Sequence, residues 1–173
     1  MHYKLLGVLM EENQSFYAYI EMVSGSDIKY VFDEKEKRLK LHRKTALPLP
    51  FPFNYGFIKG TISGDGDPLD VFIVSKRGID LGSTIRTKPI GIIYAEDEMG
   101  IDNKIIAVDE DDSGTAGFKD IESIGKKDME RLVYILEHNK DGMEGRWTKV
   151  KGTGGRENAI AEIRKALNAV KKS

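Results

Sequence analysis

Three aspartates in a short run are the residues of this sequence best suited to metal chemistry. Asp65, Asp67 and Asp70 are separated by Gly66 and Pro68, two residue types that permit a bend. A bend would bring the three carboxylates together, whereas an extended chain would point Asp70 away from the other two. Carboxylate oxygens beside a phosphate suit Mg²⁺. An aspartate-rich turn without a ligand remains an alternative, because Asp and Gly are common in turns.

A second acidic cluster supports the metal interpretation. Asp97 and Asp102 flank Gly100, and a segment typical of a strand follows. Carboxylates crowded into two turns would repel one another unless cations neutralised them. A third acidic run, Asp109–Asp112, is followed by loop residues without an apolar anchor and is predicted to be a solvated loop.

Charge is unevenly distributed along the chain. Residues 65–112 contain 12 acidic and 5 basic side chains, whereas residues 126–173 contain 12 basic and 7 acidic ones. A fold that joined these segments could hold cations with one part and an anion with the other. Two solvated faces of one globular protein would give the same pattern.

Composition indicates one globular domain, predicted to span residues 1–173. The chain has 27 Lys and Arg against 28 Asp and Glu, a formal net charge of -1 and no Cys. Disulfides, thiolate metal sites and a Cys nucleophile are therefore excluded. Near-neutral charge speaks against a nucleic acid or membrane partner. Met1–Leu6 is too short for a signal peptide and no apolar run could span a membrane, so we expect a soluble cytoplasmic protein.

The first two thirds of the chain have the pattern of strands and turns. Aromatic and β-branched residues predict strands at Phe16–Val23, Ile28–Phe32, Val71–Val74, Thr84–Lys88, Ile90–Tyr94 and Lys104–Val108. The first two are expected to form a hairpin through Ser24–Asp27. Alternate prolines make Leu47–Phe53 an ordered connector, because proline cannot donate to a ladder.

Helical periodicity appears only later in the chain. Met129, Leu132, Val133 and Leu136 predict a helix over Lys126–Lys140, and a second apolar stripe predicts one over Arg156–Lys171. The glycine-rich segment Lys151–Arg156 between them is expected to be a flexible connector. Many short strands indicate a barrel or a sandwich. The simplest predicted fold is mainly β with flanking helices, one β-barrel with two principal α-helices.

The ordered set of these residues resembles the soluble family I inorganic pyrophosphatases. Asp65–Val71 matches the family signature, in which spaced aspartates precede a barrel strand. Residues upstream and downstream match in the family's order over about Phe16 to Lys149. The resemblance implies an OB-fold-like closed β-barrel that hydrolyses pyrophosphate to two orthophosphates by metal-activated water. It also implies several Mg²⁺ ions per site, with Mn²⁺ as a possible substitute, and a homo-oligomer in which a hexamer is favoured.

The resemblance implies a role for each matched residue. Asp67 is similar to the catalytic base that accepts a proton from the attacking water. The implied metal ligands are Glu21, Asp65, Asp70, Asp97 and Asp102. The implied substrate-binding residues are Lys29, Arg43, Tyr55, Lys104, Asn139 and Lys140.

Three positions depart from the family pattern. Val31 stands where a Glu is usual, and Phe51 and Asn139 stand where a Tyr is usual. Asn139 would bind phosphate through a short amide in place of a phenol. On this basis Asn139→Tyr is expected to tighten substrate binding.

Two other function classes remain open from the sequence. The departures are compatible with a pyrophosphatase-like barrel that is weak or inactive as a catalyst and binds metal and phosphorylated ligands. A barrel of this type could also bind single-stranded nucleic acid. The acidic segment and the lack of aromatic residues interleaved with Lys or Arg speak against that third class.

Overall fold

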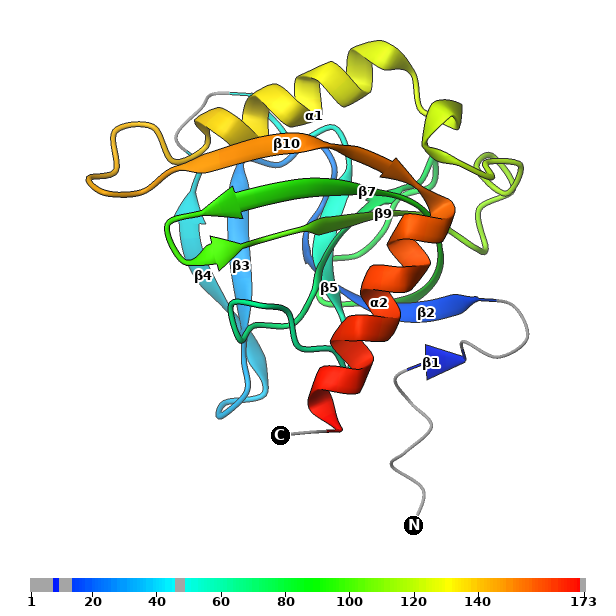
Figure 1. The fold of residues 1–173 in the computed structure, drawn as a ribbon, viewed down its shortest axis with the longest axis horizontal. Coiled ribbons are helices and arrows are strands. Elements are labelled where there is room, and N and C mark those ends of the chain that lie inside the picture. The colour runs from blue at the N-terminus through cyan, green and yellow to red at the C-terminus, as the bar shows by residue number, and fades with distance from the viewer. Residues whose placement is uncertain (1–7, 10–13, 46–48, 172–173) are drawn as a thin grey trace.

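The computed structural model describes residues 8–9, 14–45 and 49–171 and is drawn in Figure 1. Met1–Leu6, and Leu47 and Pro48 of the predicted connector, lie outside the described residues. The remainder of that connector, residues 49–53, belongs to no strand, as predicted.

A closed five-stranded barrel forms the centre of the molecule. Around the barrel the strands are β2 (Ser15–Met22), β5 (Asn54–Ile58), β6 (Asp70–Val74), β9 (Lys104–Asp109) and β7 (Thr84–Asp97). The barrel closes because β2 also pairs with β7. β6 and β9 run parallel, and the other neighbours in the barrel run antiparallel. The predicted closed barrel is confirmed.

Short strands extend the barrel, and sequence patterning did not predict them. β1 (Val8–Leu9) pairs with β2, while β8 (Gly100–Ile101) and β10 (Thr148–Gly155) pair with β7. β7 itself replaces the two strands that we expected on either side of Pro89. Its pairing with β9 shifts register between Pro89 and Gly91, so the strand continues past a residue that lacks a backbone donor.

The predicted hairpin between Phe16–Val23 and Ile28–Phe32 is wrong. β3 (Ile28–Asp33) pairs instead with β4 (Arg38–Lys44), and the two form a separate two-stranded sheet. The turn after β2 exists, since Ser26 N donates to Val23 O at 3.1 Å. The partners of β2 are β5 and β7, because closing the barrel uses both edges of that strand.

Two helices cover the strands, as predicted, and a short 3-10 helix (η2, Ile121–Ser123) precedes them. α1 (Lys126–His138) lies across β10, and α2 (Arg156–Val170) lies against the front of the barrel in Figure 1. Successive residues of β6 alternate between two buried clusters. Val71 and Ile73 pack in the cluster that contains α2 residues, and Phe72 packs in the cluster that contains α1 residues. Strand alternation therefore attaches each helix to its own face of the strands.

The glycine-rich connector was also predicted wrongly. Residues 151–155 are the second half of β10, paired with Ile92 and its neighbours in β7. A Cβ at Gly154 would lie 2.9 Å from Ile92 Cγ2, so the small residue permits close approach of the two strands. Glycine has low strand propensity, so the local sequence does not predict a strand here. Pairing with the long strand β7 stabilises it.

The acidic run Asp109–Asp112 is not a fully solvated loop as predicted. Asp109 is completely buried, and Asp112 is 7% exposed. Arg77 Nη2 donates to Asp109 Oδ1 at 3.1 Å, and Asp112 accepts from the backbone of Lys76 and Gly114. Hydrogen bonds to polar partners, and not apolar contacts, hold this run in place.

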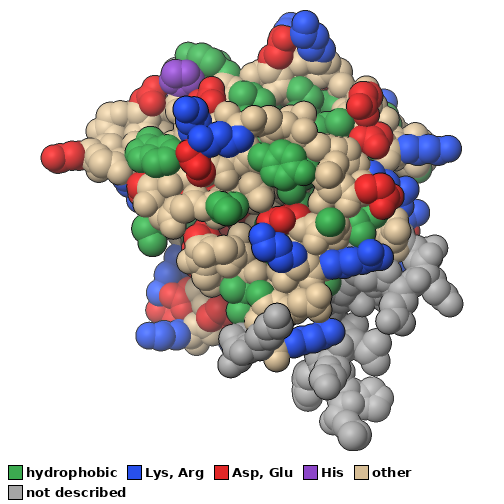
Figure 2. Space-filling view, in the orientation of Figure 1, with side chains coloured by type: hydrophobic (Ala, Val, Ile, Leu, Met, Phe, Trp, Pro, Cys, Tyr) green, Lys and Arg blue, Asp and Glu red, His purple; other side chains and the backbone are tan. Residues whose placement is uncertain are grey.

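The outer surface carries both charge types. On the face drawn in Figure 2, acidic and basic side chains are interspersed among scattered apolar ones. In the part of the chain that the structure describes, no helix combines the length and apolar character needed to cross a membrane.

Gly56→Ala is expected to destabilise the barrel severely. A Cβ at Gly56 would lie 1.8 Å from the backbone oxygen of Tyr19, so β2 and β5 would have to separate. We expect the free energy of unfolding to fall by about 3 kcal/mol or more. The measurement is urea unfolding followed by circular dichroism.

Gly78→Ala is the matched control, because no heavy atom lies within 4 Å of a Cβ there. An equal stability of the two variants would contradict the close approach of β2 and β5.

Candidate active site

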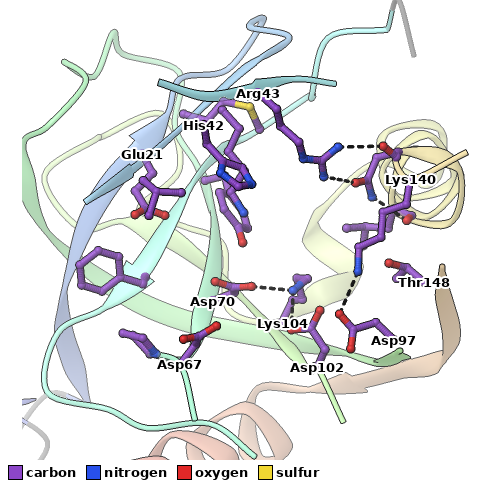
Figure 3. Close-up of a pocket in the computed structure, with 18 of the residues that line it drawn as sticks. Glu21, His42, Arg43, Asp67, Asp70, Asp97, Asp102, Lys104, Lys140 and Thr148 are labelled. Carbon is purple, nitrogen blue, oxygen red and sulfur yellow. Dashed lines mark hydrogen bonds and ion pairs between the residues drawn. The ribbon is translucent and has the colours of Figure 1, made fainter. Parts of the chain in front are cut away.

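All of the predicted site residues line one cavity of about 570 Å³, shown in Figure 3. The cavity lies between the barrel, the separate β3–β4 sheet and the end of α1. In Figure 3 the labelled aspartates lie in a row on one side, and Arg43 and His42 lie on the other. Acidic and basic groups thus face each other across one space.

Barrel topology collects the aspartates at one edge. Asp70 begins β6, and its partner in the parallel ladder is Lys104 at the start of β9. β7 runs antiparallel to β9, so it ends at the same edge with Asp97. Asp102 is held in the turn before β9, where its N–H donates to Ala95 O at 2.9 Å.

The turn before β6 carries Asp65 and Asp67. Gly66 has a φ of 90°, a conformation that favours glycine, and Asp67 N donates to Asp65 Oδ1 at 3.0 Å. Burial raises the pKa of Asp65, and the neighbouring charge of Asp67 adds to the effect. Within the described residues, the Asp67 carboxylate forms no ion pair and accepts no hydrogen bond.

Lys104 lies between two carboxylates of this edge. Its Nζ donates to Asp70 Oδ2 at 2.6 Å and to Asp102 Oδ1 at 2.7 Å, and its side chain is 7% exposed. Burial alone would lower the pKa of Lys104, but the two negative charges outweigh burial and raise it. Burial alone would raise the pKa of Asp70, but Lys104 and Lys29 outweigh burial and lower it.

Lys140 is held in a second charged cluster. Its Nζ lies 2.8 Å from Asp97 Oδ2 and 3.1 Å from Glu98 Oε2. Glu98 also accepts from Arg146 Nε at 2.8 Å and from Trp147 N at 3.2 Å. Burial would raise the pKa of Glu98, but hydrogen bonds from its own backbone, Lys140, Trp147 and Arg146 outweigh burial and lower it to about 2.

Cations of the opposite wall come from the β3–β4 sheet. Lys29 and Arg43 are partners in its ladder, and Lys29 Nζ lies 5.0 Å from the centre of the Tyr55 ring. Burial lowers the pKa of Lys29, although Asp70 opposes the shift. Among the described residues, neither Lys29 nor Arg43 forms an ion pair with a carboxylate. Both are therefore available to an anionic ligand.

Glu21 and Tyr55 complete the barrel side of the cavity. Glu21 is 7% exposed, and its Oε1 accepts from the backbone N–H of Phe32 at 2.9 Å. Burial raises the pKa of Glu21. Burial also raises the pKa of Tyr55, with a further contribution from the charge of Asp70. The Tyr55 phenol therefore stays protonated, and it is hydrogen-bonded to Asp70.

Comparison with known proteins shows the family. The model of the family described as inorganic pyrophosphatase matches residues 18–171. The chain belongs to the inorganic pyrophosphatase family. It is 39% identical to the inorganic pyrophosphatase of Sulfolobus acidocaldarius over 87% of this chain and 88% of the relative. It is 36% identical to that of Aquifex pyrophilus over 99% and 98% of the two chains.

A solved pyrophosphatase structure has the same fold. The inorganic pyrophosphatase of Helicobacter pylori superposes with a TM-score of 0.88 at 32% identity, over 92% of this chain and 95% of the other.

The carboxylates of this pyrophosphatase-family site suit a hard cation. In the described residues, no three acidic or histidine side chains already form an ion-binding cluster. Burial nevertheless raises the pKa values of Glu21, Asp65 and Asp102, so their negative charge is incompletely compensated. A bound divalent cation would supply the missing charge, and oxygen ligands of this kind fit Mg²⁺. The residues present therefore fit the metal.

The sequence interpretation missed three residues of the site. Glu98 binds both Lys140 and Arg146. Arg146 and His42 line the cavity, and His42 lies beside Arg43 on β4. Burial lowers the pKa of His42, and Lys29, Arg43 and Arg146 add to the shift. Glu98 could have been found by its position next to Asp97. Nothing in the sequence pattern distinguishes His42 or Arg146 from surface residues.

Lys104→Met is expected to destabilise the metal-free protein. The change leaves Asp70 and Asp102 as neighbouring carboxylates without their cation, so we expect the free energy of unfolding to fall by about 3 kcal/mol at pH 7. Urea unfolding in EDTA measures this loss.

Lys151→Met is the matched control, because its ion pair with Glu96 is exposed and contributes less than about 1 kcal/mol. A loss for Lys104→Met no larger than that of the control would refute the structural role of Lys104.

Glu98→Gln is expected to flatten the acid dependence of stability. The Glu98 pKa in the folded protein lies below its ordinary value, so its stabilising effect is full above pH 4.5 and disappears as the pH falls toward 2. The free energy of unfolding should therefore drop less between pH 5 and pH 3 in Glu98→Gln than in the unmodified protein.

Glu34→Gln serves as the control, since Glu34 is 74% exposed at the side chain. Identical pH profiles of Glu98→Gln and the unmodified protein would be evidence against the Glu98 cluster.

Proposed function

We propose that this protein is an inorganic diphosphatase that hydrolyses pyrophosphate to two orthophosphates with the help of Mg²⁺. The observation that supports this most strongly is one cavity that a row of aspartates shares with Lys29 and Arg43, two cations that form no ion pair with a carboxylate among the described residues. Pyrophosphate carries several negative charges and repels an attacking hydroxide. A catalyst must therefore bind its oxygens with cations while it generates the nucleophile nearby.

The proposed phosphate-binding residues are of two kinds, those without a carboxylate partner and those already paired with one. Among the described residues, Lys29 and Arg43 carry positive charge without a carboxylate partner. Tyr55 lies next to Lys29, and its phenol would exchange its hydrogen bond to Asp70 for one to phosphate. Lys104 and Lys140 are already bound to carboxylates, so they reach phosphate from positions that those carboxylates fix. Charge-assisted hydrogen bonds from such groups are the strongest available for phosphate oxygens.

The proposed metal ligands are the carboxylates of the barrel edge: Glu21, Asp65, Asp70, Asp97 and Asp102. Bound Mg²⁺, or Mn²⁺ in its place, would offset the charge of the phosphates and make water a stronger acid near neutral pH. The incompletely compensated charge of Glu21, Asp65 and Asp102 supports this assignment.

Asp67 is the proposed general base. It lies in the same turn as Asp65, lines the cavity and has no cation or hydrogen-bond donor on its carboxylate within the described residues. A carboxylate that no cation neutralises can accept the proton of the attacking water at Oδ1 or Oδ2. The neighbouring Asp65 and Asp70 hold their place through their own contacts.

The proposal extends to the state of the protein in the cell. We propose one pyrophosphatase domain over residues 1–173, in a cytoplasmic homo-oligomer with a hexamer favoured. The barrel and both helices share continuous buried clusters, which supports a single domain. Sedimentation velocity would measure the oligomer.

Phosphate release from pyrophosphate tests the reaction. We expect rapid release with Mg²⁺ or Mn²⁺ and none in EDTA. Asp67→Asn should lower kcat by about 10²-fold or more with an unchanged melting temperature, because it removes only the proton acceptor.

Asp80→Asn is the control, since Asp80 is exposed outside the cavity. Full activity of Asp67→Asn would remove Asp67 from the mechanism. Tight metal-dependent pyrophosphate binding without release would instead support the non-catalytic binding protein.

A further inference from the structure

Arg43 is held across the cavity by two hydrogen bonds to Asn139. Its Nη1 donates to the backbone oxygen of Asn139 at 3.0 Å, and its Nη2 donates to Asn139 Oδ1 at 2.8 Å. Arg43 belongs to β4, whereas Asn139 is the C-cap of α1. The two bonds therefore fix the plane of the guanidinium and join two walls of the cavity.

The amide of Asn139 is itself fixed in one orientation. Its Nδ2 donates to Leu136 O at 2.7 Å, one of the carbonyls that a helix end leaves without an internal partner. A flipped amide would place its oxygen against Leu136 O and its nitrogen against the guanidinium. Asn139 is 7% exposed, so solvent offers it little alternative.

We propose that Asn139 is a positioning residue that presents Arg43 to the phosphate groups of the substrate. This inference rests on the proposed function. A guanidinium has five N–H donors, of which Asn139 takes two and Met143 Sδ, at 4.0 Å from Nη1, takes one. Nε–H and one hydrogen on Nη2 are left for phosphate. The free carbonyls at the end of α1 carry partial negative charge, which also favours a cation there.

The assignment differs from a direct contact between Asn139 and phosphate. Its amide oxygen is an acceptor already occupied by Arg43, and its amide nitrogen is held on the helix end. A tyrosine at position 139 would keep only the backbone bond to Arg43 and would lose both amide bonds. Asn139→Tyr should therefore weaken substrate binding, contrary to the expectation from the sequence.

A double-mutant cycle distinguishes positioning from direct contact. The proteins are the unmodified chain, Asn139→Ala, Arg43→Ala and the double variant, each measured for kcat and KM with pyrophosphate and saturating Mg²⁺. We expect Asn139→Ala alone to raise KM about tenfold with a smaller change in kcat. In the Arg43→Ala background the same change should have no further effect, because coupled residues are not additive.

Three results would overturn the proposal. Equal effects of Asn139→Ala in both backgrounds would mean that Asn139 acts independently of Arg43. A lower KM in Asn139→Tyr would mean that a phenol serves the substrate better than the clamp. An unchanged KM in Asn139→Ala would leave Asn139 only a structural role.

Asn158→Ala is the matched control for folding. Asn158 Oδ1 accepts from Gly155 N at 3.1 Å, so this asparagine caps a helix end outside the cavity. We expect its loss to lower the melting temperature without changing KM.

Calorimetric titration of the same variants with pyrophosphate in EDTA, where no phosphate release is expected, gives the cycle in Kd without turnover. If the unmodified protein releases no phosphate even with Mg²⁺, the proposed function fails, while coupling in Kd still supports the clamp. Additive changes in Kd, or no binding by the unmodified protein, would overturn the positioning role of Asn139.

Discussion

The bond network around Lys104 is the constraint on which the site depends. The parallel pairing of β6 and β9 sets Asp70 beside Lys104, and the turn before β9 adds Asp102. Replacing any one of these three side chains would destabilise the fold, because it would leave a buried charge without its partner. The barrel edge can therefore concentrate acidic groups that would otherwise repel one another.

The same edge remains short of positive charge. Lys104 and Lys140 engage Asp70, Asp102 and Asp97, but burial still raises the pKa values of other carboxylates in the cavity. Positive charge without a carboxylate partner lies on the opposite wall, on Lys29 and Arg43. One wall thus has an excess of negative charge and the other an excess of positive charge, which suits a polyanion accompanied by metal cations.

Sequence patterning predicted the chemistry better than the topology. Spaced aspartates, the two apolar helix stripes and the β-rich segments indicated a metal site and a β-barrel with helices. The resemblance to the pyrophosphatase family added the closed barrel and the other residues that share the cavity. Strand partners were not readable, because β2 closes the barrel with both of its edges and leaves β3 to pair with β4. β10 was missed because glycines fit close strand packing that local propensity does not reveal.

Charged contacts between distant segments were the least predictable features. Glu98 accepts hydrogen bonds from Lys140, Arg146 and the backbone N–H of Trp147. Buried Asp109 accepts one from Arg77. Each pairing depends on loop geometry that no periodicity encodes. The contact between Arg43 and Asn139 spans 96 residues and is equally invisible in the sequence.

The separate β3–β4 sheet has a consequence for how this site can change over evolution. Its wall is linked to the rest of the cavity by individual contacts, such as Glu21 with Phe32 and Arg43 with Asn139. Within the described part of the chain, it shares no ladder with the barrel. Single substitutions at such contacts can adjust the width of the gap while the barrel keeps its hydrogen bonds. The protein therefore separates the part that selection can tune from the part that must fold.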